Sequence, residues 1–207
     1  MISAPGALER LAEGNRRFVS GAPGRRYATA RPHETAAGQD PFAIVLGCSD
    51  SRVPAEIVFD QGLGDLFVIR VAGNIVAPSQ VGSVEFAAER FGTQLVVVLG
   101  HTECGAVLAT IEELEDPSVT RLPNLRSIVD RIRPSVEPLF ETELREDPNA
   151  LVRKAVRANI RAAANHLRHG SQLLEKRLQN GDLFIVGAEY SLETGVVDFF
   201  DGLPADC

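Results

Sequence analysis

The chain has 207 residues, enough for one ordinary domain with a sizeable buried core, and 44% of them are hydrophobic and 24% charged. The formal net charge is −7 at pH 7, and Lys and Arg form no dense cluster, which argues against nucleic acid as a partner. No apolar run reaches the length of a membrane span, and Glu9 and Arg10 lie where a signal peptide would be hydrophobic. We therefore expect a cytoplasmic protein that binds no membrane.

The first predicted element is an amphipathic helix over residues 5–20, where Leu8, Leu11 and Phe18 recur at helical spacing among charged residues. A stretch rich in Gly, Pro, Arg and Thr follows over residues 21–38 and predicts an extended connector. We expect a single domain over residues 1–207, with an N-terminal arm and connector over 1–38 and an α/β core over 39–207.

Four short apolar runs in the core predict buried strands. Each is rich in Val, Ile, Leu or Phe and apolar at successive positions, which is typical of strands that are covered on both faces of a parallel sheet. The runs are residues 42–47, 66–69, 95–99 and 183–186.

Helical patterns separate these runs. One begins at Asp147, an N-cap residue followed by Pro148 at the first helical position, and it ends at Gly170. The others cover residues 83–91, 106–114 and 171–180. Strands that alternate with helices predict an α/β fold with a mostly parallel sheet flanked by helices.

Residues that bind metals follow two of the predicted strands. Cys48 comes directly after the first apolar run, and His101 and Cys104 come after the third. In open parallel sheets, ligands bind at the carboxyl ends of the strands, beside a switch in strand order. We therefore expect these three side chains to meet at one edge of the sheet.

Thiolate and imidazole are donors that zinc binds in tetrahedral geometry. Three protein ligands leave a fourth position open for water, which is the catalytic pattern, whereas structural sites fill all four positions. The alternative is a pair of buried cysteines with a core histidine and no metal. The strand-end placement favours zinc, as do Gly47, Gly100 and Gly105, whose missing side chains allow close backbone approach.

A carboxylate and a guanidinium side chain, Asp50 and Arg52, follow the first cysteine at alternate positions. Asp50 is two residues after Cys48, so its carboxylate is expected near the fourth zinc position. Arg52 can hold that carboxylate in a bidentate, charge-assisted pair, which favours the ionised form and turns it away from the metal. The alternative is a surface turn with an incidental ion pair that contributes little.

The sequence resembles the β-class carbonic anhydrases. The motifs that carry the resemblance are CSDSRVP at 48–54 and GHTECGA at 100–106, supported by FVIRVAGN at 67–74 and GAEYSLETG at 187–195. The resemblance spans about residues 5–200. It implies the reversible hydration of carbon dioxide to bicarbonate and a proton.

The resemblance also implies particular residue roles and an assembly. Cys48, His101 and Cys104 would bind Zn2+, and Asp50 and Arg52 would form the catalytic dyad. The fold would have a mainly parallel sheet of four or five strands. The N-terminal helical arm would embrace a partner in a homodimer or a homotetramer, and the apolar face of residues 5–20 fits this, because such a face needs a cover.

The subtype follows from a residue near the first ligand. Some bacterial members mark an allosteric bicarbonate site with a tryptophan shortly before the first cysteine, where this chain has Val45, and the chain has no tryptophan at all. The resemblance therefore implies a plant-like, non-allosteric member. Its substrate pocket would contain Gln39, Phe67, Ala72 and Gly105, with Phe86 in place of a tyrosine found in some members.

Two thiolates cancel the double charge of zinc, so we expect activity that rises into the alkaline range. His33, His166 and His169 are available to carry the proton to solvent, and the sequence favours none of them over a surface or packing role. Two other functions stay open. One is hydrolysis of carbonyl sulfide or carbon disulfide on the same zinc site, and the other is a non-catalytic zinc or redox sensor with a closed, four-ligand site.

Overall fold

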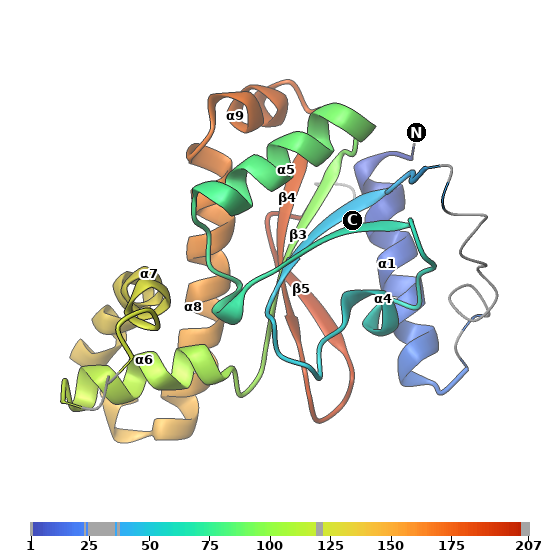
Figure 1. Cartoon of the computed structure of the whole chain (residues 1–207). Coiled ribbons are helices and arrows are strands. Elements are labelled where there is room, and N and C mark those ends of the chain that lie inside the picture. The colour runs from blue at the N-terminus through green and yellow to red at the C-terminus, as the bar shows by residue number, and fades with distance from the viewer. Residues whose placement is uncertain (1, 23, 25–35, 37, 119–121, 204–207) are drawn as a thin grey trace.

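A five-stranded sheet forms the centre of the protein (Figure 1). The computed structural model describes residues 2–22, 24, 36, 38–118 and 122–203. The strands lie in the order β2-β1-β3-β4-β5. Their bounds are β1 Ala43–Gly47, β2 Leu66–Arg70, β3 Leu95–His101, β4 Phe184–Tyr190 and β5 Val197–Asp201.

Four of the strands are parallel, and β5 alone is antiparallel, paired with β4. The four expected strands and the mostly parallel α/β sheet are confirmed. Strand β5 was not predicted from the sequence, in which charged Asp198 and Asp201 flank the aromatic pair Phe199 and Phe200. This strand lies at the edge of the sheet and is only partly buried, so it lacks a continuous apolar run.

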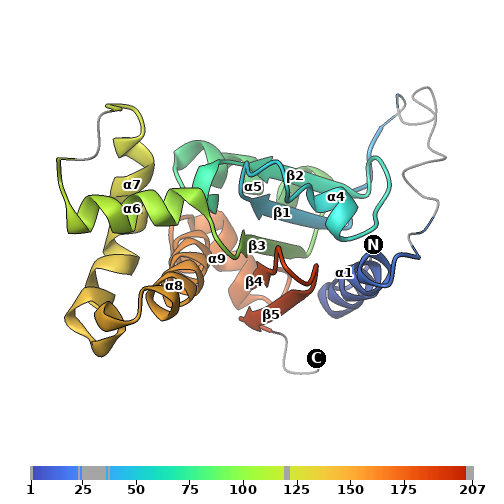
Figure 2. The same cartoon turned by 90° about the horizontal axis from the view of Figure 1, so that it is seen from below.

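The two faces of the sheet bury different helices. Alternate strand residues point to opposite faces, so Ile44 and Leu46 join one core cluster while Ala43 and Val45 join the other. The first cluster is covered by α5 Pro78–Phe91, α6 Gly105–Glu115, α7 Arg126–Val136, α8 Pro148–His169 and α9 Gln172–Gln179. The second is covered by α1 Ala4–Val19 and the short α4 Ala55–Val58, on the other side of the sheet (Figure 2).

The long helix α8 begins and ends as its sequence predicts. The Asp147 side chain accepts a hydrogen bond from the backbone N–H of Ala150 at 3.0 Å, which caps the first turn. Its apolar stripe, including Val156 and Ile160, is buried against the sheet and α7. The structure adds α7 and the 3-10 turns η1 Ala72–Asn74, η2 Glu137–Glu141 and η3 Glu143–Glu146, which the sequence analysis did not predict.

The N-terminal helix packs on its own chain. Leu8 and Leu11 of α1 are buried with strand residues of the second cluster, and Asn15 donates hydrogen bonds to the carbonyls of Val58 and Gly195 at 3.1 and 2.8 Å. Contrary to expectation, this apolar face therefore needs no partner to cover it, because the chain's own sheet covers it. Most of the predicted connector lies outside the described residues.

Among the described residues, no helix combines the length and the apolar character that crossing a membrane requires.

Candidate metal centre

The register of β1 with β3 brings the predicted ligands together. Gly47, the last residue of β1, lies opposite Leu99, so Cys48 leaves the sheet beside the end of β3, whose last residue is His101. Cys104 follows as the N-cap residue of α6. One potential ligand atom from each of these side chains lies within 4.8 Å of the others, and all three residues are buried.

The donor atoms fit a zinc ion. The sulfurs of Cys48 and Cys104 are 4.0 Å apart, and tetrahedral zinc with Zn–S bonds of about 2.3 Å would place two sulfurs about 3.8 Å apart. His101 Nδ1 lies 2.8 Å from the carbonyl oxygen of Thr102, an acceptor, so Nδ1 carries the proton and Nε2 is left with a free lone pair. Nε2 is buried and has no hydrogen-bond partner among the described residues, as expected for a metal ligand.

Negative charge is already favoured in this site. The hydrogen bond between the two sulfurs is the main cause that lowers the pKa of the Cys48 thiol below its usual range, and it raises the pKa of Cys104. The backbone N–H of Gly73 also donates to the Cys48 sulfur at 3.3 Å. The Gly73 N–H thus favours a thiolate at Cys48, the form in which cysteine binds a metal.

The turn between the second and third ligands has an unusual backbone. Glu103 has φ +55°, in the left-handed region that residues other than Gly, Asn and Asp seldom adopt. Its side chain is exposed. The left-handed residue turns the chain between His101 and Cys104, which lets both side chains face one point.

Asp50 and Arg52 form the predicted pair beside this centre. Arg52 Nε and Nη2 donate to the two carboxylate oxygens of Asp50 at 3.0 and 2.8 Å, and the Arg52 backbone N–H adds a bond of 2.9 Å. The hydrogen bonds from Arg52 hold the pKa of Asp50 well below its usual range. Asp50 Oδ2 is 3.8 Å from His101 Nε2, so the carboxylate reaches the edge of the ligand set.

A second arginine, which the sequence analysis missed, fixes the same turn. Arg70 at the end of β2 donates from Nε to the Cys48 carbonyl at 3.0 Å and from Nη2 to the Asp50 carbonyl at 2.6 Å. The sequence does contain a sign of this role, because Arg70 is a charged residue at the end of the apolar strand β2. A strand end beside β1 is where a residue can reach the Cys48 turn.

Only one of the three glycines singled out in the sequence is tightly packed. A Cβ on Gly100 would lie 2.5 Å from two side-chain atoms of Ile160 on α8, so the helix approaches β3 where a side chain is missing. A Cβ on Gly47 would make an ordinary contact of 3.8 Å, and Gly105 faces open space. The expectation of close approach is therefore wrong for Gly47 and Gly105.

The expected substrate-pocket residues fall into two groups. Ala72 precedes Gly73, whose N–H bonds to Cys48, and Gly105 follows Cys104, so both are at the centre. Gln39 precedes the start of β1, at the opposite end of this strand from Cys48. Phe67 pairs with Ile44 early in β1 and contacts Phe86 of α5, with ring centroids 6.1 Å apart.

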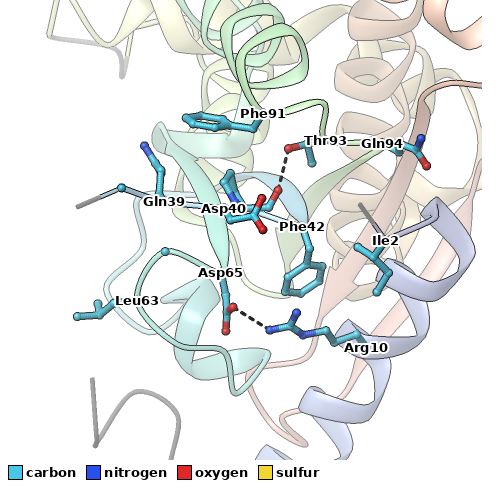
Figure 3. Close-up of a pocket in the computed structure, with 13 residues that line it drawn as sticks. Ile2, Arg10, Gln39, Asp40, Phe42, Leu63, Asp65, Phe91, Thr93 and Gln94 are labelled. Carbon is cyan, nitrogen blue, oxygen red and sulfur yellow. Dashed lines mark hydrogen bonds and ion pairs between the residues drawn. The ribbon is translucent and has the colours of Figure 1, made fainter. Parts of the chain in front are cut away.

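Gln39 lies in a cavity of about 440 Å³ at that far end of the sheet (Figure 3). Arg10 of α1 reaches into it, over the ring of Phe42 at 3.9 Å and 2.8 Å from the carboxylate of Asp65. The structure thus brings the ligands and the dyad together within one chain, but not Gln39, Phe67 or Phe86.

Of the histidines considered as proton carriers, His166 and His169 are exposed on α8. His169 Nδ1 lies 3.7 Å from the Glu175 carboxylate. His33 lies outside the described residues.

Known proteins share both the sequence and the fold. The profile of the family described as "Carbonic anhydrase" matches residues 43–197. The chain is 40% identical over 193 residues to Carbonic anhydrase 2 of Mycobacterium tuberculosis, covering 91% of this chain and 89% of that protein. It is 37% identical to a carbonic anhydrase of Mycolicibacterium smegmatis, covering 93% and 91%.

Among solved structures, the β-carbonic anhydrase CcaA superposes with a TM-score of 0.73 at 27% identity, covering 94% of this chain and 95% of that one. A tetrameric β-carbonic anhydrase of Sordaria macrospora gives a TM-score of 0.73 at 22% identity, covering 82% and 85%. The second likeness concerns the fold alone.

The backbone at Glu103 yields a prediction. Glu103→Val places a β-branched residue at a positive φ and is expected to lower the free energy of unfolding by about 1–2 kcal/mol. Glu103→Asn is the matched control, because asparagine tolerates this conformation, and it should leave the stability unchanged or raise it. Urea unfolding at fixed protein and zinc concentrations measures both. Equal stabilities for the two variants would show that the left-handed residue carries no strain.

Proposed function

The chain belongs to the β class of the carbonic anhydrase family, and we propose that it catalyses the reversible hydration of carbon dioxide to bicarbonate and a proton. One observation carries the proposal. Three buried donor atoms converge, and an ionised carboxylate held by an arginine lies directly beside them. Three ligands with a separate acid–base pair are the arrangement of a water-activating site and not of a closed structural one.

In this proposal Cys48, His101 and Cys104 hold zinc. When bound, zinc would lower the pKa of the water at its open position and so provide a stronger nucleophile. The Asp50 carboxylate accepts a hydrogen bond from the attacking water and so orients it toward carbon dioxide. Arg52 occupies both carboxylate oxygens, which keeps Asp50 ionised and restrains it from becoming a fourth ligand.

The sulfur ligands set the pH range of the reaction. Sites with three neutral histidines bring the pKa of zinc-bound water to about 7. Cys48 and Cys104 bring two negative charges instead, which offset the charge of the ion, so the water is acidified less.

Stopped-flow assays of carbon dioxide hydration test the function. We expect activity that is lost on zinc chelation, is restored by zinc, and rises with pH between about 6.5 and 9 because of the two thiolates. A rate that is flat over this range would contradict the charge argument. No hydration at any pH, with turnover of carbonyl sulfide on the same zinc-loaded protein, would contradict the proposed substrate.

We further propose a homodimer or homotetramer in which a second copy completes the substrate pocket. Gln39, Phe67 and Phe86 are expected near substrate, yet they lie away from the metal centre of their own chain. Phe86 is 55% exposed and packs edge-on against Phe91, with ring centroids 5.9 Å apart, so an aromatic surface is available to a partner. A second copy placed against this surface would bring these side chains to its neighbour's zinc.

Mixing an inactive variant with an impaired one tests the shared pocket. Cys48→Ser removes a ligand but keeps Gln39, and Gln39→Ala keeps the ligands and is expected to lose about tenfold in kcat/KM. Co-refolded together they should recover about a quarter of wild-type activity, because half of the randomly formed dimers are mixed and each has one complete site.

Cys48→Ser mixed with Cys104→Ser is the control, since both changes disable the same chain's ligand set and no complete site can form. A mixture of Cys48→Ser and Gln39→Ala that only averages its two components would contradict a pocket shared between copies.

We also propose the plant-like, non-allosteric subtype, a single domain over residues 1–207, and a cytoplasmic location. Val45, at the position of the tryptophan in allosteric members, is fully buried in the second core cluster and exposes no side chain. Helix α1 shares that cluster with the sheet, which supports one domain. Cys48 and Cys104 are free thiols, as a reducing compartment favours.

A further inference from the structure

A chain of two hydrogen bonds leads from α8 to the sulfur of the first ligand. Asn159 Nδ2 donates to the carbonyl oxygen of Gly73 at 2.8 Å, and the backbone N–H of Gly73 donates to the Cys48 sulfur at 3.3 Å. Asn159 is 3% exposed, so water competes little for its amide. Among the described residues, Asn159 and Cys48 are the only side chains that hydrogen-bond to Gly73.

The two hydrogen bonds are made by consecutive peptide groups on either side of Gly73, in a turn whose backbone needs support. Gly73 and Asn74 have φ values of +68° and +44°, two consecutive left-handed residues, of which only the first is a glycine. Such conformations persist where the surroundings hold them. A Cβ on Gly73 would lie 2.7 Å from Ile132 Cδ1 and 3.0 Å from Ala106 Cβ, so helices α6 and α7 confine the turn from one side.

Those apolar contacts restrict where the turn lies, but they do not select the direction of its N–H and C=O groups. A hydrogen bond to the Gly73 carbonyl selects the direction of that group and so restricts the ψ angle of Gly73. The Asn159 amide fixes the carbonyl of the Gly73–Asn74 peptide. The N–H donated to Cys48 belongs to the preceding Ala72–Gly73 peptide, which is joined to the first through the φ and ψ angles of Gly73. Helix α8 itself is held close by the missing side chain at Gly100, against which Ile160, the neighbour of Asn159, packs.

We propose that Asn159 is a positioning residue for the metal centre. It acts through Gly73, whose N–H it keeps aimed at the Cys48 sulfur, and it touches neither the metal nor the substrate. An N–H donated to a thiolate draws electron density from the sulfur and fixes its orientation, as polar partners of metal ligands do. The same bond partly offsets the excess negative charge of a site with two thiolates. The inference rests on the proposed zinc site.

The test replaces the donor in two ways. Asn159→Asp keeps the shape but cannot donate to the Gly73 carbonyl, and Asn159→Ser is uncharged and too short to reach it. Asn165→Asp is the matched control, an exposed asparagine on the same helix that accepts a hydrogen bond from Arg168 at 2.8 Å. The probes are Co2+, through the thiolate-to-cobalt charge-transfer bands, and Zn2+, through competition with a chelator.

We expect both Asn159 variants to shift the charge-transfer bands and to bind zinc about 10- to 100-fold more weakly, while the control matches the wild type. Bands that stay unchanged in folded Asn159 variants would overturn the inference and leave Asn159 a structural residue. A shift in Asn159→Asp alone would also overturn it, because the added charge would then be the cause.

If the Asp variant does not fold, the Ser variant and the control decide the question. Failure of this inference is separate from failure of the proposed function. A wild-type protein without carbon dioxide hydration would refute the function, whereas an active wild type with unchanged Asn159 spectra would refute only the positioning role.

Discussion

The parallel pairing of β1 with β3 is the contact on which the metal centre depends. Because Gly47 lies opposite Leu99, Cys48 and His101 leave the sheet at the same edge, and the turn through Glu103 then brings Cys104 to them. A slip of one residue would point each side chain of the slipped strand to the other face and separate the ligands. The apolar residues of β1 and β3 are fully buried on both faces, so such a slip would expose a core to water or bury the wrong side chains. The geometry of the site is thus stabilised by the hydrophobic core beneath it.

Charge balance is the second constraint. The site gathers two sulfurs and the Asp50 carboxylate around a buried imidazole. The negative charge of the thiolates and the carboxylate needs compensation when it is buried. Zinc would offset the sulfurs, while Arg52 and the Gly73 N–H offset Asp50 and Cys48. Arg70 adds a guanidinium on the backbone carbonyls of the same turn, which fixes the spacing between ligand and acid. We expect the same two sulfurs that hold the metal to limit how strongly it acidifies water, and the activity therefore to rise into the alkaline range.

The sequence was sufficient for features that leave a local signal. Buried parallel strands are continuous apolar runs, and residues directly after such runs lie at one sheet edge, so the ligands and the Asp50–Arg52 pair were predicted. Strand β5 was missed because an edge strand mixes charged and aromatic residues, and α7 was missed because Pro134 lies within it. Asn159 contacts Gly73 across 86 positions of the chain, and helical periodicity marks it only as a polar residue on a buried stripe. The placement of Gln39 and Phe67 away from the ligands of their own chain could not be predicted either, because a motif gives residue types and not the distances between them in the fold.

The central claim is that Cys48, His101 and Cys104 hold a metal with one exchangeable position beside Asp50. Titration of the cobalt-substituted protein with thiocyanate, near neutral pH, tests it most directly, because the anion binds only where a coordination position can be vacated. The account predicts a tetrahedral spectrum with thiolate charge-transfer bands that changes saturably as thiocyanate is added. A spectrum with the same bands that does not respond to the anion would mean a closed four-ligand site and would contradict the account.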